Sequence, residues 1–325
     1  MITRAQAPAV SIVLCTHNRA EQLRRTLGTL FAVDTPPGVE WDVIVVDNNS
    51  SDATRQVVDA CSRRTAPGVR YLFEPTQGIS FARNAGVRAA SGEVVAFIDD
   101  DVTIGAGWLT ALYRAFQDGR CIGVGGRIRA GWSSPKPAWY ADAGPYRLMK
   151  GIAEYEHGDD PVQVGPDRPP FGGNMAFRRR AFELHGLFRT DLGRVGSRRM
   201  GGEDTEYGRR LMAAGEAIMY APDAVVTHPV EPFKLRKAFF RRYYYYYGRQ
   251  LVRLDKERAS IGSYFGVPRH LFRSLASHAL RWAVALDPQQ RFFHQLQCWQ
   301  VVGSIVERRS GLSPAGPGNA LSDRV

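Results

Sequence analysis

The sequence predicts an α/β fold whose sheet is mostly parallel and flanked by helices. Apolar runs of strand length alternate with segments of helical spacing along the first half of the chain. The connections between them are short, and this alternation favours parallel strands with helices on both faces of the sheet. The 325 residues, 44% of them hydrophobic and 23% charged, suffice for one large core or two smaller ones.

Each expected element rests on its own pattern. Four apolar runs are long enough for a buried strand and too short for most helices. They are 10–15, 42–46, 69–73 and 94–98. A first helix is expected at 19–31, where Leu23, Leu27 and Leu30 share one face. A second helix is expected to begin after an N-cap at Ser51 or Asp52, and a third is expected near 79–90. After 121–128, a long irregular excursion is expected over 129–170, and the chain is expected to re-enter the core at 171–177. Later elements are expected at 201–211 (helix), 220–222 and 224–228 (strands), and from Phe233 on (helices).

Polar clusters directly follow three of the expected strands. They occupy 16–19, 47–50 and 99–101. In parallel α/β sheets, ligands bind beyond the carboxyl ends of the strands. We therefore expect the three clusters to converge on one crevice.

The third cluster consists of three adjacent carboxylates, Asp99, Asp100 and Asp101. Such carboxylates repel one another unless a cation lies among them. Hard oxygen ligands without a nearby cysteine suit Mg²⁺ or Mn²⁺, the ions that usually accompany phosphates. The alternative is a solvated acidic turn.

The motifs together resemble the family 2 glycosyltransferases, which have the GT-A fold, a Rossmann-like, mostly parallel sheet flanked by helices. The similarity covers roughly residues 9–230 in the right order. The matching segments are 10–19, 45–52, Arg83-Asn84-Ala85-Gly86, 97–101 with its DXD motif, Gly173-Asn174 and Gly202-Glu203-Asp204. The resemblance implies an inverting enzyme with a nucleotide-sugar donor and a divalent metal, Mn²⁺ or Mg²⁺.

The resemblance also implies roles for residues that bind the donor. Asp47 would hydrogen-bond the base, and Thr16 and Arg19 would line the nucleotide pocket. Asp99 and Asp100 would face the ribose and the sugar. The other donor-binding residues are Asn18, Asn49, Arg83 and Asn84. As alternatives, Asp47 and Asn49 would cap the following helix, and Arg83 and Asn84 would only close a contact between a helix and a loop.

Metal and acceptor residues follow from the same resemblance. Asp101 would bind the metal, with Asp99 and His228 as further ligands, although His228 also fits a structural role. Gly173 and Asn174 would bind the acceptor.

Asp204 is implied to be the general base. An acceptor hydroxyl must lose a proton as it attacks, so a carboxylate must lie within hydrogen-bond reach. Glu203, and with it one of Arg198 and Arg199, would orient Asp204. The alternative is that these acids only complement the dipole of the helix that they begin.

The positive charge is concentrated near the C-terminus. Residues 232–310 contain 15 Lys and Arg against 4 Asp and Glu, so this segment carries the whole net charge of +11. We therefore expect a catalytic domain over 1–231, a basic helical extension over 232–310 and a disordered tail over 311–325. Basic residues interleaved with aromatic ones suit attachment to an anionic membrane surface. A helical bundle or an oligomer interface is the alternative. Without a recognition motif, nucleic acid is not an expected partner.

The expected location is cytoplasmic, peripheral on the inner face of the cell membrane. The four cysteines are scattered, and neither a signal-peptide pattern nor a membrane-spanning run is present. The expected partners are a nucleotide-sugar donor and a glycan or lipid-linked acceptor, in polysaccharide, glycolipid or glycoconjugate synthesis. Two rival hypotheses are a nucleotidyltransferase acting on a sugar phosphate and a catalytically silent, membrane-associated protein that binds nucleotide sugars.

Overall fold

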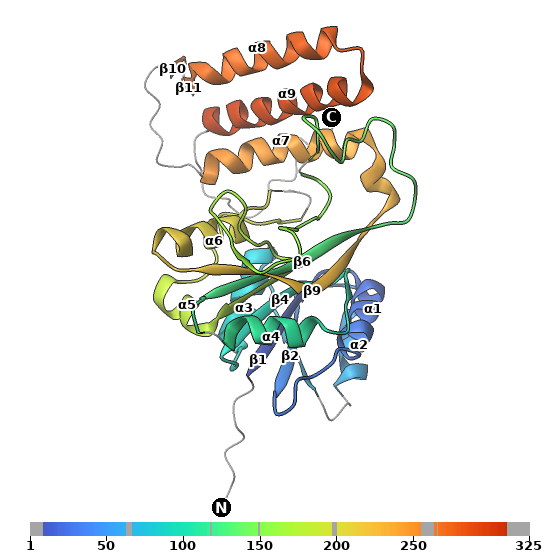
Figure 1. Cartoon of the computed structure of the whole chain (residues 1–325), viewed down its shortest axis with the longest axis vertical. Helices are drawn as coiled ribbons and strands as arrows, with labels where there is room; N and C mark the ends of the chain where they lie inside the picture. Colours follow the sequence, from blue (N-terminus) through green and yellow to red (C-terminus); the bar gives the residue numbers. More distant parts are fainter. Residues whose placement is uncertain are drawn as a thin grey trace, which may run out of the picture. The chain divides into compact units, whose positions relative to one another are not determined.

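The computed structural model describes residues 9–62, 67–117, 119–148, 150–196, 200–254, 263–264 and 266–310. Within these ranges the chain forms two compact units (Figure 1). The sheet unit combines the described residues up to Pro137 with those from 150 to Arg236. The helical unit combines Ala138–Leu148 with the described residues from Lys237 on. The predicted tail at 311–325 lies outside the described residues.

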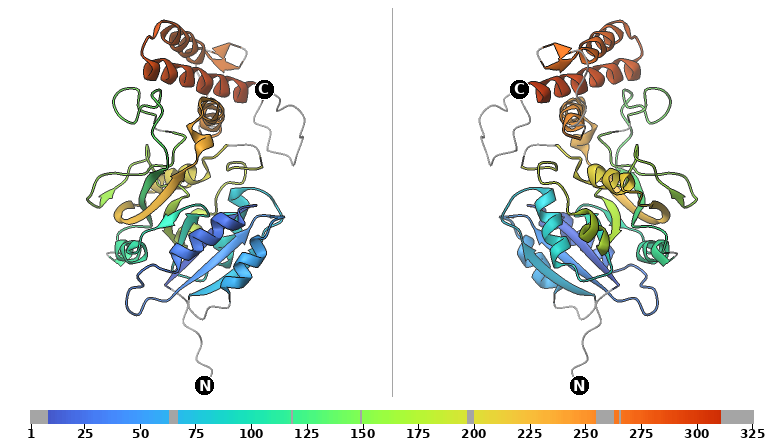
Figure 2. Two further views of the ribbon diagram at one scale, coloured as in Figure 1. Left: turned by 90° about the vertical axis from the view of Figure 1, so that its right-hand side faces the viewer. Right: turned by 90° about the vertical axis from the view of Figure 1, so that its left-hand side faces the viewer.

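Four parallel strands in the order β3-β2-β1-β4 form one half of the sheet. They are β1 (Val10–Thr16), β2 (Trp41–Asp47), β3 (Gly68–Phe73) and β4 (Val94–Asp99). The crossover helices are α1 (Ala20–Leu30), α2 (Thr54–Cys61) and α3 (Ile79–Ala89). The middle strands read as continuous apolar runs because helices cover both faces of the sheet (Figure 2). The chain turns back between β1 and β4, which makes this point the topological switch of the sheet.

The other half of the sheet is mixed. β8 pairs antiparallel with both β4 and β6, whereas β6 runs parallel to β9. The short strands β5 and β7 pair antiparallel with β9. The strands are β5 (Thr103–Ile104), β6 (Gly123–Trp132), β7 (Val162–Gln163), β8 (Asn174–Arg178) and β9 (Ile218–Val230). The helices are α4 (Trp108–Gln117), α5 (Arg179–His185), α6 (Glu203–Ala213) and the 3₁₀ helix η1 (Pro232–Leu235). The predicted mostly parallel sheet with flanking helices is confirmed.

Two local predictions differ from the structure. The two short strands expected at 220–222 and 224–228 belong to one strand, β9, which pairs with β6 at 218–221 and again at 226–230. The β9 residues 222–225, which include Pro222, form a bulge opposite the single β6 residue between Gly126 and Ile128. Helix α2 begins one residue later than expected. Asp52 precedes its N-cap, and its carboxylate accepts bonds from the backbone and hydroxyl of Thr54.

The helical unit is built on three helices, α7 (Lys237–Leu254), α8 (Arg269–Val284) and α9 (Pro288–Arg309), with a small hairpin of β10 (Ser263–Tyr264) and β11 (Val267–Pro268). Helix α9 lies between α7 and α8 (Figure 1). The start of α9 is well specified, because Asp287 caps it by accepting a bond from Gln290 N and Pro288 follows as the first helical residue. None of the described helices is both long and apolar enough to span a bilayer.

Helices α7 and α9 approach each other closely at two glycines. A Cβ at Gly248 would collide with the backbone carbonyl of Gln300, and one at Gly303 would collide with that of Tyr245. Both obstacles are main-chain atoms of a helix, so no side chain can rotate away. The close crossing therefore depends on glycine at both positions.

We predict that Gly303→Ala destabilises the helical unit by about 2 kcal/mol, because the overpacking cost exceeds the gain in helix propensity. The matched control is Gly28→Ala on α1, where a Cβ would meet nothing within 4 Å. The control should stabilise its helix by up to about 1 kcal/mol. Hydrogen exchange of the α7 and α9 amides measures the effect. Unchanged protection in the Gly303 variant would contradict the close crossing.

Candidate active site

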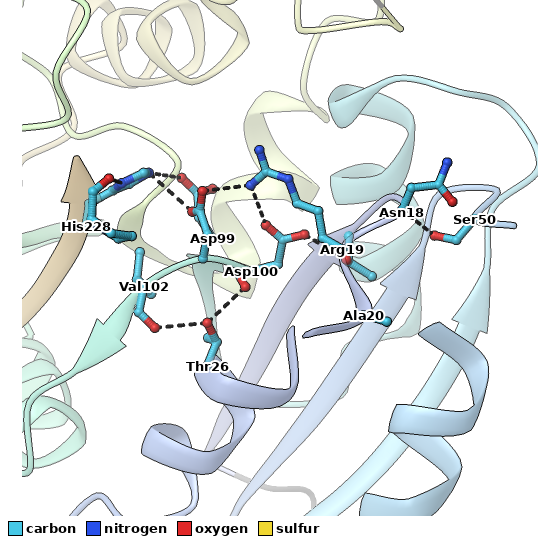
Figure 3. Close-up of polar contacts among 12 residues, drawn as sticks. Asn18, Arg19, Ala20, Thr26, Ser50, Asp99, Asp100, Val102 and His228 are labelled. Carbon is cyan, nitrogen blue, oxygen red and sulfur yellow. Dashed lines mark hydrogen bonds and ion pairs between the residues drawn. The ribbon is translucent and has the colours of Figure 1, made fainter. Parts of the chain in front are cut away.

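The three polar clusters meet at the carboxyl ends of β1, β2 and β4 (Figure 3). The hydroxyl of Thr16, at the end of β1, donates to Asp100 Oδ2 at 2.7 Å. The backbone N–H of Asn18 donates to Ser50 Oγ at 2.9 Å, which joins the cluster after β1 to the cluster after β2. These contacts place the crevice at the switch point of the sheet, where ligands of open α/β sheets bind.

The three adjacent carboxylates point in different directions. Asp100 is buried against β1, where it accepts bonds from Thr16 and from Arg19 Nη1 at 3.2 Å. Burial raises the pKa of Asp100 to about 7, with Asp101 and Asp99 adding to the rise and Arg19 opposing it. The turn that carries the triplet is fixed by Thr26, whose hydroxyl lies 2.9 Å from the carbonyl oxygens of both Asp100 and Val102.

Asp99 and Asp101 turn instead toward His228 on β9. His228 Nε2 lies 3.2 Å from Asp101 Oδ1 and 4.0 Å from Asp99 Oδ2. Its Nδ1 lies 3.1 Å from the carbonyl oxygen of Pro229. That carbonyl can only accept, so Nδ1 carries a proton. Without a metal, a proton on Nε2 would bond to Asp101, whereas a bound cation would take the lone pair of Nε2 instead.

This arrangement fits a divalent metal. One ligand atom from each of the three residues lies within 4.8 Å of the other two. Adjacent ligands of a six-coordinate ion with bonds of about 2.1 Å lie roughly 3 Å apart, so small side-chain movements would close the set. The carbonyl behind His228 is the outer partner that fixes a ligating imidazole. Carboxylate oxygens and one imidazole suit Mn²⁺ or Mg²⁺ better than soft metals.

Cations surround the carboxylates even without a metal. Arg19 Nη1 donates to Asp101 Oδ2 at 2.7 Å. Burial would raise the pKa of Asp101, but the charges of His228, Arg19 and Lys234 outweigh it and hold that pKa below its ordinary value. Burial lowers the pKa of Lys234, against the attraction of Asp101 and Glu231.

A second ionic group lies beside the first. Arg83 on α3 is buried, and its Nη1 donates to Glu203 Oε1 at 2.5 Å while Nη2 lies 3.9 Å from Asp99 Oδ1. Glu203 Oε2 is buried and has no hydrogen-bond partner among the described residues. Burial and the charge of Asp204 raise the pKa of Glu203, and Arg83 opposes them. Arg83 thus connects the acidic triplet to the start of α6.

The predicted base, Asp204, is held by the backbone at the start of α6. Its Oδ2 accepts a bond from Gly172 N at 3.0 Å, and its Oδ1 accepts one from Thr205 N at 2.6 Å. Oδ1 also accepts a bond from the hydroxyl of Thr205 at 3.2 Å, so Oδ2 is the oxygen that retains a lone pair for an acceptor hydroxyl. A Cβ at Gly172 would collide with the guanidinium of Arg83 and would displace it from its place beside Glu203. A Cβ on Gly173 would lie 3.2 Å from Asp99 Oδ2.

Several predicted donor or acceptor residues have internal partners. Asp47 is buried and accepts bonds from Ser50 N and from Tyr71 OH, each at 2.8 Å. Asn84 exchanges two bonds with the backbone of Phe188. The amide of buried Asn174 accepts from Trp108 Nε1 and donates to the carbonyls of Arg127 and Ala224. These bonds give all three a structural role, and their ligand-binding roles stay predictions.

Asn18 and Asn49 lie on the exposed rim of the crevice. Both have positive φ angles, 52° and 65°, which asparagine tolerates better than most residues. Asn18 Oδ1 accepts a bond from Ser51 N at 2.7 Å, so the two turns support each other.

Three cationic residues of the site were not predicted from the sequence. They are Lys150, which interacts electrostatically with Asp204, Lys234, which interacts with Asp101, and Arg194, which interacts with Glu203 and Lys234. None belongs to a motif. The only signal is that Lys234 follows His228 by six residues in the segment that leaves the sheet. The other predicted orienting residues, Arg198 and Arg199, lie outside the described residues.

Comparison with known proteins identifies the family. The model of the family described as Glycosyl transferase family 2 matches residues 11–186, more than half of the chain. The chain belongs to glycosyl transferase family 2. It is 30% identical to the succinoglycan biosynthesis protein ExoM of Rhizobium meliloti over 251 residues, 77% of this chain and 76% of that protein. It is 28% identical to the glucosyl-dolichyl phosphate glucuronosyltransferase of Haloferax volcanii, over 77% of this chain and 79% of that protein.

Solved structures give the same fold. The chain is similar to the mannosyltransferase PcManGT from Pyrobaculum calidifontis in complex with GDP-Man and Mn²⁺, with a TM-score of 0.62, 19% identity, and coverage of 93% of this chain and 88% of that chain. It is also similar to GalNAc-T7 with UDP, GalNAc and Mn²⁺, with a TM-score of 0.54, 18% identity, and coverage of 75% and 51%. The predicted GT-A fold and family are confirmed, and the protein is a glycosyltransferase that uses nucleotide sugars.

We predict that Arg83→Met costs this glycosyltransferase about 3–5 kcal/mol of stability near pH 7.5, because it leaves the buried Glu203 carboxylate without its cation. The double variant Arg83→Met/Glu203→Gln should lose less stability, since the carboxylate of Glu203 is replaced by a neutral amide. Denaturant unfolding of the two single variants and the double variant measures the coupling.

The same comparison has a pH signature. A carboxyl group whose pKa is raised on folding binds more protons in the folded state. Burying the Glu203 carboxyl therefore lowers the free energy of unfolding only as the pH rises above 4.5, the ordinary pKa of glutamate. The stability difference between Arg83→Met and the double variant should therefore shrink as pH is lowered toward about 5. Additive effects at all pH values would contradict the ion pair.

Proposed function

We propose that this glycosyltransferase is metal-dependent and inverting, and that it moves a sugar from a nucleoside-diphosphate sugar to an acceptor hydroxyl. The supporting observation is the convergence of Asp99, Asp101 and His228 at the switch point, with the Asp204 carboxylate at the start of the neighbouring helix α6. The metal-binding and base-catalysed parts of the proposal can be tested separately.

In the proposed site, Asp99, Asp101 and His228 hold the metal, Mn²⁺ or Mg²⁺. The bound ion would neutralise the charge that develops on the leaving diphosphate. Thr16, Arg19 and Asp100 line the nucleotide side of the crevice, and the Asp47 loop with Asn18 and Asn49 forms its rim. Both structural neighbours hold a nucleotide or nucleotide sugar together with Mn²⁺, which supports this assignment.

Asp204 is proposed as the general base, with Glu203 and Arg83 as positioning residues. The acceptor oxygen attacks the anomeric carbon as the bond to the diphosphate oxygen breaks, and the acceptor proton passes to Asp204. A single displacement from the face opposite the leaving group inverts the anomeric carbon. Gly173 lies beside Asp99, where the acceptor would approach.

We further propose that the acceptor is a glycan or a lipid-linked glycan, and that the enzyme attaches peripherally to an anionic membrane surface. One relative is named for succinoglycan biosynthesis and another for a glucosyl-dolichyl phosphate, which supports polysaccharide or glycolipid synthesis. The excess of basic residues over 232–310 supports the attachment.

The products of the reaction distinguish a transferase from a nucleotidyltransferase. Donor hydrolysis that requires Mn²⁺ or Mg²⁺ and releases a nucleoside diphosphate supports the transferase. Release of pyrophosphate from a nucleoside triphosphate and a sugar phosphate would support a nucleotidyltransferase.

For the metal site, we predict that Asp101→Asn weakens Mn²⁺-dependent binding of UDP or GDP by at least roughly 100-fold. Loss of an outer partner alone costs 10- to 100-fold in metal affinity, and Asp101 is proposed as a direct ligand. Calorimetry with each nucleotide, with and without Mn²⁺, is the measurement. The control is Asp223→Asn, an exposed acid on the same strand as His228. Equal affinity in both variants would refute the metal assignment.

For the base, we predict that Asp204→Asn preserves donor binding and lowers transfer by about 10²–10⁴-fold, because the amide keeps the shape of the carboxylate but accepts no proton. Glu206→Gln in the same helical turn is the control, since that carboxylate pairs with Arg210. Transfer rates at saturating donor are compared with nucleotide affinities. A variant that keeps nearly full transfer would show that another group is the base.

A further inference from the structure

Much of the basic and aromatic character of the helical unit is used inside it. Glu307 on α9 is buried and accepts a bond from Arg249 at 2.7 Å and from Arg253 at 2.5 Å. Within the tyrosine run, Tyr244 and Tyr246 are buried. The part of the segment that faces α9 therefore stabilises the α7–α9 pair and is not free to meet a partner.

Helix α8 is different, because none of its residues is buried. It packs on α9 along one side, through residues such as Leu271, Leu275 and His278, which are only half-buried. The Nδ1 atom of His278 lies 3.0 Å from that of His294 on α9, which marks the packed side. The opposite side carries Arg273 and Leu280, both exposed.

The exposed side of α8 combines positive charge with large apolar side chains. Arg269, Arg273 and Arg281 supply the charge, and the stretch from 263 to 286 contains no acidic residue. Leu280 and Val284 are each 65% exposed, and Leu286, just beyond the helix, is 96% exposed. Leu280 and Val284 are four residues apart and lie on the same face. We call this surface the α8 face, defined by Arg269, Arg273, Leu280, Arg281, Val284 and Leu286.

We infer that the α8 face is the surface by which this enzyme lies on an anionic lipid bilayer, with α8 in the plane of the interface. The inference rests on the peripheral attachment proposed above and assigns it to one helix. A helix of 16 residues is too short to span the hydrocarbon core, and its three arginines without an acid complement anionic headgroups. Leucine and valine side chains beside them reach the acyl boundary, while arginine stems cover apolar surface and keep their charge in the headgroups.

Two tryptophans lie away from the α8 face. Trp282 and Trp299, about one third exposed at 36% and 37%, line a hollow of about 360 Å³ together with Arg241 of α7. Trp282 is two residues from Leu280 and therefore lies on the packed side of α8, so this hollow is not part of the α8 face. A protein partner could also cover the apolar residues of this face. The face itself holds three arginines and no acid, with the exposed Asp287 just beyond Leu286, so a surface of uniform negative charge matches it better.

The test measures binding of the full chain to phosphatidylcholine vesicles with and without phosphatidylglycerol. The charge variant is Arg273→Gln/Arg281→Gln, and its control is Arg88→Gln/Arg114→Gln, two exposed helical arginines of the sheet unit. The apolar variant is Leu280→Ser, and its control is Leu184→Ser on α5, which is 67% exposed. Each pair changes charge or hydrophobicity equally, so only the location differs.

The wild-type protein should bind the anionic vesicles and much less the neutral ones, and the binding should weaken as salt is added. The charge variant should bind the anionic vesicles roughly 30-fold more weakly, and Leu280→Ser roughly fivefold more weakly, while both controls bind as the wild type does. Binding of UDP or GDP with Mn²⁺, measured on the same proteins, should be unchanged in all variants. If the wild-type protein bound neither UDP nor GDP with Mn²⁺, that result would refute the proposed donor site and leave the α8 face untouched.

Three results would overturn the inference. One is equal binding to neutral and anionic vesicles by the wild type. Another is an equal loss of binding in the variants and their controls. The third is a dimer in solution that Leu280→Ser dissociates without any change in lipid binding, because the α8 face would then cover a second copy of the chain.

Discussion

The site depends on keeping three adjacent carboxylates at one strand end without a large repulsive cost. The chain does this by directing them apart. Asp100 turns into the protein, where Thr16 and Arg19 hold it and burial raises its pKa to about 7. Asp99 and Asp101 turn outward toward His228. Arg19 bridges the two directions, since its Nη1 reaches both Asp100 and Asp101. A divalent ion would supply positive charge between Asp99 and Asp101, which still face one another. The negative charges that repel each other there are also the ones that would attract the metal.

A second constraint connects this cluster to the proposed base. Arg83 lies between Asp99 and Glu203, and the glycine at 172 allows its guanidinium to occupy that place. The same glycine donates its N–H to Asp204. Gly172 therefore leaves room for the guanidinium of Arg83 and also orients the carboxylate of Asp204 through a hydrogen bond. A substitution there would disturb the metal side and the base side together, which explains why the separate variants at Asp101 and Asp204 are the informative ones.

The sequence predicts the fold and the position of the crevice well, because both depend on local patterns. Apolar runs define the strands, and strand order places their polar ends together. The internal partners of Asn84 and Asn174 could not be predicted, since Phe188 and Trp108 are distant in sequence and no periodicity links them. Lys150 and Arg194 come from irregular segments, and Lys234 comes from the short helix η1, so their positions depend on tertiary packing. Two short strands were expected at 220–222 and 224–228, but pairing with β6 on both sides of a bulge at 222–225 makes them one strand.

Net charge alone was also an incomplete guide to the C-terminal segment. Residues 232–310 carry a net +11, yet two of the arginines on α7 pair with buried Glu307, where they hold helices together. The single carboxylate offsets one of the two positive charges, and both guanidinium groups are directed at Glu307. The arginines of α8 have no acid within their stretch of sequence, so their field extends toward solvent. A charge count becomes an argument about partners only after the internally paired charges are removed, and for this chain that step moves attention from the tyrosine run of α7 to the exposed side of α8.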